Sequence, residues 1–305
     1  MTTMPLQPRP GCDMSAVPSG VVTPVACCQL ALSVGDLDGN RAAAQQAIKG
    51  AAAAGAKVVV LPELANSGYV FRDTAEASEL AEPFDGPTVT GWTEMARRHD
   101  LIVVGGICER DEGGRLHNSA VLVDADGVRA LYRKAHLWDA EKTIFEPGAE
   151  LPPVVDTAVG RIGVLVCYDL EFPEWVRTVA LRGADLLCAP VNWPLFPRPE
   201  GERPAEVVRV QANAAVNRMF VAACDRTGVE RGVSWTGGSV IADPDGHPAA
   251  GPLPTYEEGM VIAKCKLGDA RDKRLSARND VFADRRPDLY RSILQSVVRT
   301  DSRTS

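Results

Sequence analysis

The sequence predicts an α/β fold in which stacked β-sheets are covered by helices on their outer faces. Short β-rich runs alternate with segments of helical composition, and several runs are apolar throughout, as is typical of strands buried on both faces. No repeat, long linker or change of composition divides the 305 residues, so one large domain is expected. With 45% hydrophobic and 24% charged residues, the chain can form a sizeable core.

The first half of the chain predicts strands and helices in alternation. Strands are expected at Thr23–Leu30, Lys57–Leu61 and Leu101–Cys108, and helices at Asn40–Ala54 and Thr88–His99. Gly55 follows the first helix, where a residue without a side chain readily ends a helix. Strand–helix–strand units join parallel strands through right-handed crossovers, so these three strands should pair in parallel.

A hairpin is expected near the middle of the chain. Asn118–Asp124 and Val128–Lys134 flank the dipeptide Asp126-Gly127, which strongly favours a tight turn between strands. Further strands and two helices are then expected, in the order Arg161–Cys167, Pro173–Arg182 (helix), Asp185–Pro190, Ala205–Arg218 (helix), Met219–Cys224, Ser239–Ala242 and Met260–Lys266. A turn is expected at Asp243–Gly246.

The two ends of the chain differ from its middle. Residues 1–22 are rich in Pro, Ser and Gly and lack the apolar core of a signal peptide, which predicts a disordered leader before a domain at 23–275. The remaining tail, 276–305, is rich in Arg and Asp and should end in a short helix at Asp288–Val298. Its apolar stripe (Leu289, Ile293 and Val297) would pack on the domain itself or at a dimer interface.

Composition and missing motifs narrow the function. A net charge of −7 argues against nucleic acid as a partner, and no apolar stretch approaches the ~20 residues that span a membrane. The eight cysteines are dispersed without a CxxC pair, which indicates reduced thiols in a cytoplasmic protein. Phosphate-loop, dinucleotide-binding, HExxH and GxSxG signatures are absent, so chemistry by Cys, Lys and carboxylates remains.

Three reactive side chains stand at the ends of three predicted strands: Glu63, Lys134 and Cys167. Taken singly, each has an ordinary explanation as a solvated loop charge, an exposed strand end or a small buried thiol. Sites in α/β sheets form at the carboxyl ends of strands, so the three side chains could converge on one site.

The segments around these residues resemble the motifs of the nitrilase superfamily, the carbon–nitrogen hydrolases. VVVLPELANSGY (58–69), YRKAHLW (132–138) and GVLVCYDLEFPE (163–174) resemble its glutamate, lysine and cysteine motifs, in the family's chain order. EKTIFEPG (141–148) resembles the segment that carries a second active-site glutamate, here Glu141, and TGGSVIADPDG (236–246) resembles a late strand and turn. The resemblance extends from about Pro24 to Leu275.

The resemblance implies a four-layer αββα sandwich that forms a homodimer or higher homo-oligomer and needs no metal or organic cofactor. It implies that Cys167 attacks a carbonyl carbon to form a thioester, that Glu63 transfers protons, and that Lys134 stabilises the oxyanion together with the backbone N–H of Tyr168. Glu141 would orient Lys134 or the substrate amide.

The implied reaction is hydrolysis of a small carboxamide to a carboxylate and ammonia. Tyr168-Asp169 stands where nitrilases usually have a Trp-Glu pair, which favours an amidase. Hydrolysis of N-carbamoyl compounds is the alternative, with nitrile hydrolysis and a non-enzymatic binding module behind it. Candidate substrate-binding residues are Tyr168, Asn192, Trp193 and Trp138. Trp193 and Phe196 could instead pack beneath the proline-rich segment 191–204, and Trp138 has the same ambiguity.

The surroundings of Cys167 raise one electrostatic question. A reactive thiol needs a positive environment, yet Asp169, Glu171 and Glu174 follow it closely. We expect Lys134 to supply the positive charge, and the acids to begin and support the next helix. Glu174 falls in the first turn of that helix, where a carboxylate complements the helix dipole.

Overall fold

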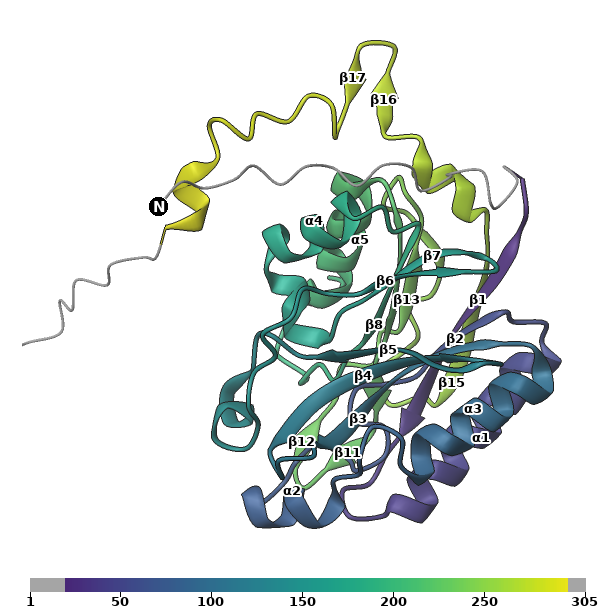
Figure 1. Ribbon diagram of the computed structural model, residues 1–305, viewed down its shortest axis with the longest axis vertical. Helices are drawn as coiled ribbons and strands as arrows, with labels where there is room; N and C mark the ends of the chain where they lie inside the picture. The colour runs from purple at the N-terminus through teal and green to yellow at the C-terminus, as the bar shows by residue number, and fades with distance from the viewer. Residues whose placement is uncertain (1–19, 296–305) are drawn as a thin grey trace, which may run out of the picture. The chain divides into compact units, whose positions relative to one another are not determined.

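Two β-sheets lie face to face in the structure, a computed structural model that describes residues 20–295. The chain divides into two units, with the boundary between Asp272 and Lys273. In the first unit, helices cover the outer face of each sheet (Figure 1). The predicted four-layer αββα sandwich is therefore confirmed.

The first sheet has seven strands. Six run in the order β10-β1-β2-β3-β4-β5, and β15 pairs with β1 as well. Their bounds are β1 (Thr23–Ala31), β2 (Val58–Val60), β3 (Ile102–Arg110), β4 (Leu116–Asp124), β5 (Gly127–Arg133), β10 (Arg226–Thr227) and β15 (Gly259–Cys265). As predicted, β1, β2 and β3 are parallel, and β4 and β5 form an antiparallel hairpin.

The second sheet has six strands in the order β14-β13-β9-β8-β7-β6. Their bounds are β6 (Val154–Thr157), β7 (Gly160–Val164), β8 (Leu186–Pro190), β9 (Phe220–Cys224), β13 (Val240–Ala242) and β14 (Pro248–Ala250). The central strands β7, β8 and β9 are parallel, and the outer pairs are antiparallel. Each sheet thus keeps a parallel centre, at whose carboxyl edge side chains from different strands can meet.

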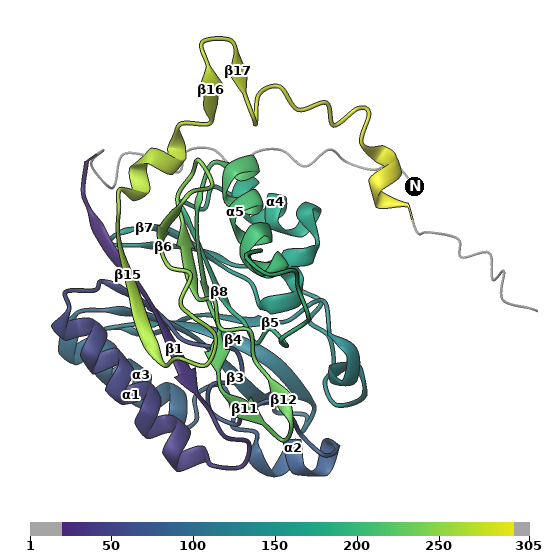
Figure 2. The same ribbon diagram turned by 180° about the vertical axis from the view of Figure 1, so that it is seen from behind.

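Helices α1 (Leu37–Ala53) and α3 (Pro87–His99) cover the first sheet, and α4 (Pro173–Leu181) and α5 (Ala205–Asn217) cover the second (Figures 1 and 2). Trp92 of α3 packs on β3 at Gly105, where an added Cβ would lie 2.7 Å from the indole ring. The glycine thus lets a large aromatic side chain approach the sheet closely. Helix α2 (Thr74–Leu80) was not predicted; it is a two-turn helix in the long connection after β2.

Short elements complete the first unit. Three 3₁₀-helices and one small hairpin occur, namely η1 (Asp139–Thr143), η2 (Cys167–Glu171), η3 (Leu267–Arg271) and the pair β11 (Val229–Glu230) with β12 (Val233–Ser234). Both η1 and η2 contain residues predicted to be catalytic, so these turns position part of the candidate site. Among the described residues, no helix is both long and apolar enough to cross a membrane.

The second unit contains the hairpin of β16 (Arg274–Ser276) and β17 (Asn279–Asp280) and the 3₁₀-helix η4 (Arg291–Leu294). The predicted α-helix at Asp288–Val298 is wrong over its described part, which forms only this short turn. Leu289 and Ile293 are exposed there, so no buried apolar face stabilises an α-helix. Val297 and residues 1–19 of the predicted leader lie outside the described residues.

Candidate active site

Glu63 lies beyond β2, on a loop that runs closely along β3. An added Cβ on Gly106 of β3 would lie 2.5 Å from Glu63 Cα, so only glycine permits this approach. Gly106 N–H donates to Pro62 O at 3.0 Å, and Ala65 N–H donates to Gly106 O at 2.8 Å. These bonds hold the loop so that the Glu63 carboxylate is fully buried between the sheets.

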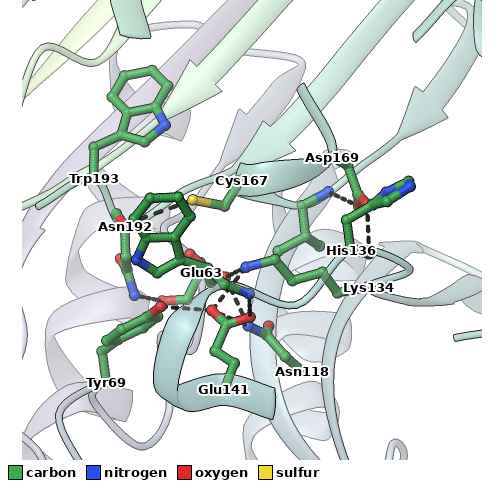
Figure 3. Close-up of polar contacts among 12 residues, drawn as sticks. Glu63, Tyr69, Asn118, Lys134, His136, Glu141, Cys167, Asp169, Asn192 and Trp193 are labelled. Atoms are coloured by element: carbon green, nitrogen blue, oxygen red, sulfur yellow. Dashed lines mark hydrogen bonds and ion pairs between the residues drawn. The ribbon is translucent and has the colours of Figure 1, made fainter. Parts of the chain in front are cut away.

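Lys134 follows β5 and lies beside two carboxylates. Its Nζ donates to Glu63 Oε1 at 2.7 Å and to Glu141 Oε1 at 2.8 Å. Glu141 comes from η1, and all three side chains are buried. Lys134 is fixed at its backbone too, because its N–H donates to Asn118 O and its carbonyl accepts from Gly148 N–H. The structure therefore brings three of the four predicted catalytic residues into direct contact (Figure 3).

Cys167 begins a turn rather than ending a strand. The predicted strand Arg161–Cys167 is too long, because β7 ends at Val164 and Cys167 is the first residue of η2. Cys167 has a φ of 44°, a left-handed conformation that is uncommon outside glycine. Its Sγ donates to Asn192 O at 3.7 Å (Figure 3), and Glu63 and Lys134 lie close enough to change the pKa of the thiol.

Two further residues belong to the polar cluster. The Tyr69 hydroxyl donates to Glu141 Oε1 at 2.6 Å, and Asn118 Nδ2 donates to Glu63 Oε1 at 2.7 Å. Sequence reasoning missed both as site residues. Tyr69 ends the quoted glutamate motif, which is a usable signal. Asn118 offers no such signal, because it is one of three consecutive polar residues, His117 to Ser119, near the start of β4.

The predicted substrate-binding residues separate into different environments. Trp138 and Tyr168 are partly exposed and pack edge to face, with ring centroids 4.9 Å apart. Asn192 is buried and its Nδ2 donates to Glu63 O at 2.9 Å. Trp193 is also buried, whereas Phe196 is exposed and lines an open groove. Trp138 and Tyr168 are thus the more accessible pair, and Asn192 is used to hold the Glu63 backbone.

Residues 24–275 match the family model described as carbon–nitrogen hydrolase. The chain belongs to the carbon–nitrogen hydrolase family. This hydrolase is 38% identical to a protein named nitrilase from Pyrococcus abyssi over 87% of this chain and 98% of the relative. It is 33% identical to an N-carbamoylputrescine amidase from Solanum lycopersicum over 85% of this chain and 91% of the relative.

A solved structure is similar to the hydrolase across most of both chains. It is a variant of the amidase from Nesterenkonia sp. AN1, described as showing Michael addition of acrylamide at the active-site cysteine. The TM-score is 0.73 and the sequence identity 27%, over 89% of this chain and 100% of that chain. The family predicted from the sequence motifs is therefore confirmed.

Burial and mutual charge set the protonation states in the hydrolase. Burial raises the pKa of Glu63 to about 7, although the ammonium of Lys134 acts in the opposite direction. Burial also raises the pKa of Cys167 well above its usual range, and the Glu63 carboxylate adds to this effect while Lys134 opposes it. For Lys134, burial lowers the pKa, but Glu141 and Glu63 more than reverse this, so it remains charged. The resting site therefore contains a thiol, an ammonium and a carboxyl group that titrates near neutrality.

One carboxylate oxygen of Glu63 has no hydrogen-bond partner in the part of the chain that the structure describes. Glu63 Oε1 accepts from Lys134 and Asn118, whereas Glu63 Oε2 is buried and has no hydrogen-bond partner among the described residues. Because a buried polar atom without a partner is costly, such an atom in a site suggests an acceptor held ready for a proton. Lys134 is committed to two carboxylates, so its positive charge at Cys167 is partly cancelled.

The acids after Cys167 do not share one environment. Asp169 is fully buried and accepts hydrogen bonds, and Glu171 pairs with Arg209 at 2.8 Å. Glu174 lies in the first turn of α4, as predicted. The thiol donates to Asn192 O rather than to any of these three carboxylates.

Proposed function

We propose that this hydrolase converts a small carboxamide to the carboxylate and ammonia through a thioester on Cys167. The observation that carries the proposal is the buried cluster of Lys134 with Glu63 and Glu141 beside a thiol, with one glutamate oxygen unpaired. A base with a pKa near 7 is suited to proton transfer at neutral pH. The Nesterenkonia amidase, described as showing Michael addition of acrylamide at its active-site cysteine, supports a nucleophilic role for the cysteine.

Acylation begins with the neutral thiol. As Cys167 Sγ attacks the carbonyl carbon, its proton passes to Glu63 Oε2, so no preformed thiolate is needed. The ammonium of Lys134, with the backbone N–H of Tyr168, stabilises the negative charge on the tetrahedral oxygen. Glu63 then gives the proton to the nitrogen, the C–N bond breaks, and ammonia leaves.

Deacylation uses the same groups in reverse. Glu63 takes a proton from water as the water oxygen attacks the thioester carbon. The C–S bond then breaks, and the proton returns from Glu63 to the sulfur. Glu141 holds Lys134 in place through its Oε1 and itself accepts from Tyr69, which fixes the direction of the ammonium. Trp138 and Tyr168 form one wall of the substrate pocket, and Asn192 and Trp193 support it.

An ammonia-release screen over aliphatic and aromatic amides, N-carbamoyl amino acids and nitriles tests the proposal. The highest kcat/KM should fall on an amide, and Cys167→Ala should eliminate the release. A nitrile or N-carbamoyl compound as best substrate would assign another reaction to the same site. No release from any compound, with slow alkylation of Cys167 by iodoacetamide, would indicate a binding module.

Hydrolysis of an N-carbamoyl compound is the second candidate. The relative from Solanum lycopersicum carries the name of such an enzyme. The chemistry at Cys167 is the same, because a carbamoyl group presents the same carbonyl carbon and terminal nitrogen. The kcat/KM ratio between matched amides and ureas would separate the two candidates.

We also propose a cytoplasmic homodimer or higher homo-oligomer, with the tail 276–305 at the interface. The cysteines in the described part of the chain are free and buried, which suits a reducing compartment. Leu289 and Ile293 of the tail are exposed apolar residues that a partner subunit would cover. Light scattering on the whole chain and on a chain ending at residue 275 would test the interface.

A further inference from the structure

Asp169 accepts four hydrogen bonds in the interior of the first unit. Its Oδ2 accepts from the Tyr132 hydroxyl at 2.8 Å and from Val166 N–H at 3.1 Å. Its Oδ1 accepts from His136 N–H at 3.1 Å and from His136 Nδ1 at 2.7 Å. The side chain is fully buried. An ionised carboxylate accepts at both oxygens, whereas an amide of the same size has one acceptor oxygen and a donor nitrogen.

These donors come from the two segments that carry the nucleophile and the lysine. Val166 directly precedes Cys167, whereas Tyr132 and His136 stand two residues before and two residues after Lys134. Figure 3 shows Asp169 and His136 on the opposite side of Lys134 from Glu141. One carboxylate therefore joins the β5 end of the first sheet to the turn that follows β7 of the second sheet.

The backbone conformation at Cys167 requires stabilising contacts of this kind. A non-glycine residue with a φ of 44° stores strain, which persists only where the surrounding contacts determine the backbone. Asp169 N–H closes the turn on Val166 O at 3.0 Å, and the Asp169 side chain accepts from Val166 N–H. The same residue thus holds both ends of the strained segment.

The donors are themselves held by aromatic packing. Trp175 Nε1 donates to the Tyr132 hydroxyl at 2.9 Å, and the His136 ring stacks on Phe172 with centroids 3.8 Å apart. Neither tyrosine nor histidine can rotate away from Asp169 without disturbing these contacts. The link between the two segments is therefore rigid, as a catalytic arrangement needs its supporting groups to be.

We propose that Asp169 is a positioning residue, which fixes the Cys167 turn relative to Lys134 by accepting hydrogen bonds from both segments. The inference rests on the proposed function, since it assumes that Cys167 and Lys134 act on one substrate carbonyl. Asp169 itself does not act on the substrate, which in the proposed mechanism is contacted by Cys167, Lys134 and Glu63. Its effect is on geometry, which matters most where attack and oxyanion stabilisation occur together.

The test compares Asp169→Asn and Tyr132→Phe with the matched control Glu171→Gln. Asparagine turns one acceptor oxygen into a donor that faces N–H or O–H donors, and phenylalanine removes a single hydroxyl. Both variants should lower kcat on the best amide by roughly 10- to 100-fold per folded molecule, with little change in KM. Glu171→Gln neutralises a carboxylate in the same turn, which pairs with Arg209 instead, and should leave kcat unchanged.

A purely structural role predicts another result. Thermal unfolding would then shift in the two variants while kcat per folded molecule stayed at the wild-type value, and this would overturn the inference. If Asp169→Asn does not fold, Tyr132→Phe alone decides between the two results. Equal losses of kcat in Glu171→Gln would also overturn it, because the effect would then come from charge rather than position.

Alkylation by iodoacetamide keeps this inference separate from the proposed function. Moving the Cys167 turn out of place separates the thiol from its proton acceptor Glu63 as well as from the cation of Lys134, so alkylation of Cys167 should slow in Asp169→Asn and Tyr132→Phe. If the wild type hydrolyses no amide, the proposed function fails, while these rates still report on Asp169. Unchanged alkylation in both variants would contradict the inference.

Discussion

Cys167, in the turn that follows β7, and Cys188, in the neighbouring strand β8, are both buried thiols, but their surroundings differ. Cys188 lies within β8, and its carbonyl accepts from Leu165 N–H at 3.3 Å, two residues before Cys167. Burial is the main cause of a raised pKa at both thiols. At Cys188 the other contributions come from further thiols, whereas at Cys167 the largest of them come from Glu63 and Lys134.

The comparison teaches that burial alone does not mark an inert cysteine. What separates the two thiols is a proton acceptor and a cation at one of them, and a backbone turn that removes the thiol from the strand. Cys188 keeps a regular strand conformation and packs as a small apolar side chain. Reactivity therefore follows from neighbours on other strands rather than from the immediate sequence.

The largest effect should come from removing the nucleophile. Cys167→Ala leaves no atom to form the thioester, so ammonia release on the best amide should fall on the order of 10⁵-fold or more. Steady-state rates on purified protein, with Cys188→Ala as matched control, measure this. Wild-type rates in Cys167→Ala, or an equal loss in Cys188→Ala, would break the comparison between the two thiols.

The second-largest effect should come from removing the base, Glu63. Glu63→Gln keeps the shape and an oxygen that accepts from Lys134 and Asn118, but the group no longer takes a proton. We expect a loss of roughly 10²- to 10⁴-fold in kcat/KM, with thermal stability nearly unchanged. Activity near that of the wild type would show that Cys167 finds its proton acceptor elsewhere.

Much of this arrangement could be predicted from the sequence. The apolar run that forms β2 and the hairpin signal after Asp124 identify strands because the residues themselves favour them. Since parallel strands share a carboxyl edge, Glu63 and Lys134 could be placed in one site. The family motifs then added Glu141, which no local pattern marks.

The features that could not be predicted from the sequence depend on contacts between segments far apart in the chain. The left-handed turn at Cys167 is closed by Asp169, whose partners are Tyr132 in β5 and His136 in the loop that follows β5. Local sequence favoured continuing the strand to Cys167, because the preceding residues are apolar and β-branched. The predicted helix at Asp288–Val298 is wrong over its described part because local sequence favoured a helix that no packing stabilises. Its apolar residues Leu289 and Ile293 are exposed.

The pH dependence of kcat/KM should show whether Glu63 is the proton acceptor that distinguishes Cys167 from Cys188. Glu63 acts as a base only when ionised, and its pKa is raised to about 7, mainly by burial. The value of kcat/KM should therefore be constant above this pH and fall about tenfold per pH unit below it. The residual activity of Glu63→Gln should lack this acid limb. An unchanged limb in that variant would assign the titration to another group.

The smallest effect is expected at the comparison thiol. Cys188→Ala removes one buried sulfur from β8 and should lower the free energy of unfolding by roughly 1 kcal/mol, as for other small deletions in a core. Denaturant unfolding measures this, and kcat per folded molecule should equal that of the wild type. A selective loss of kcat would mean that Cys188 transmits its packing through Leu165 to the Cys167 turn. In that case the two thiols would form one functional unit, and packing within β8 would have to be counted among the causes of reactivity at Cys167.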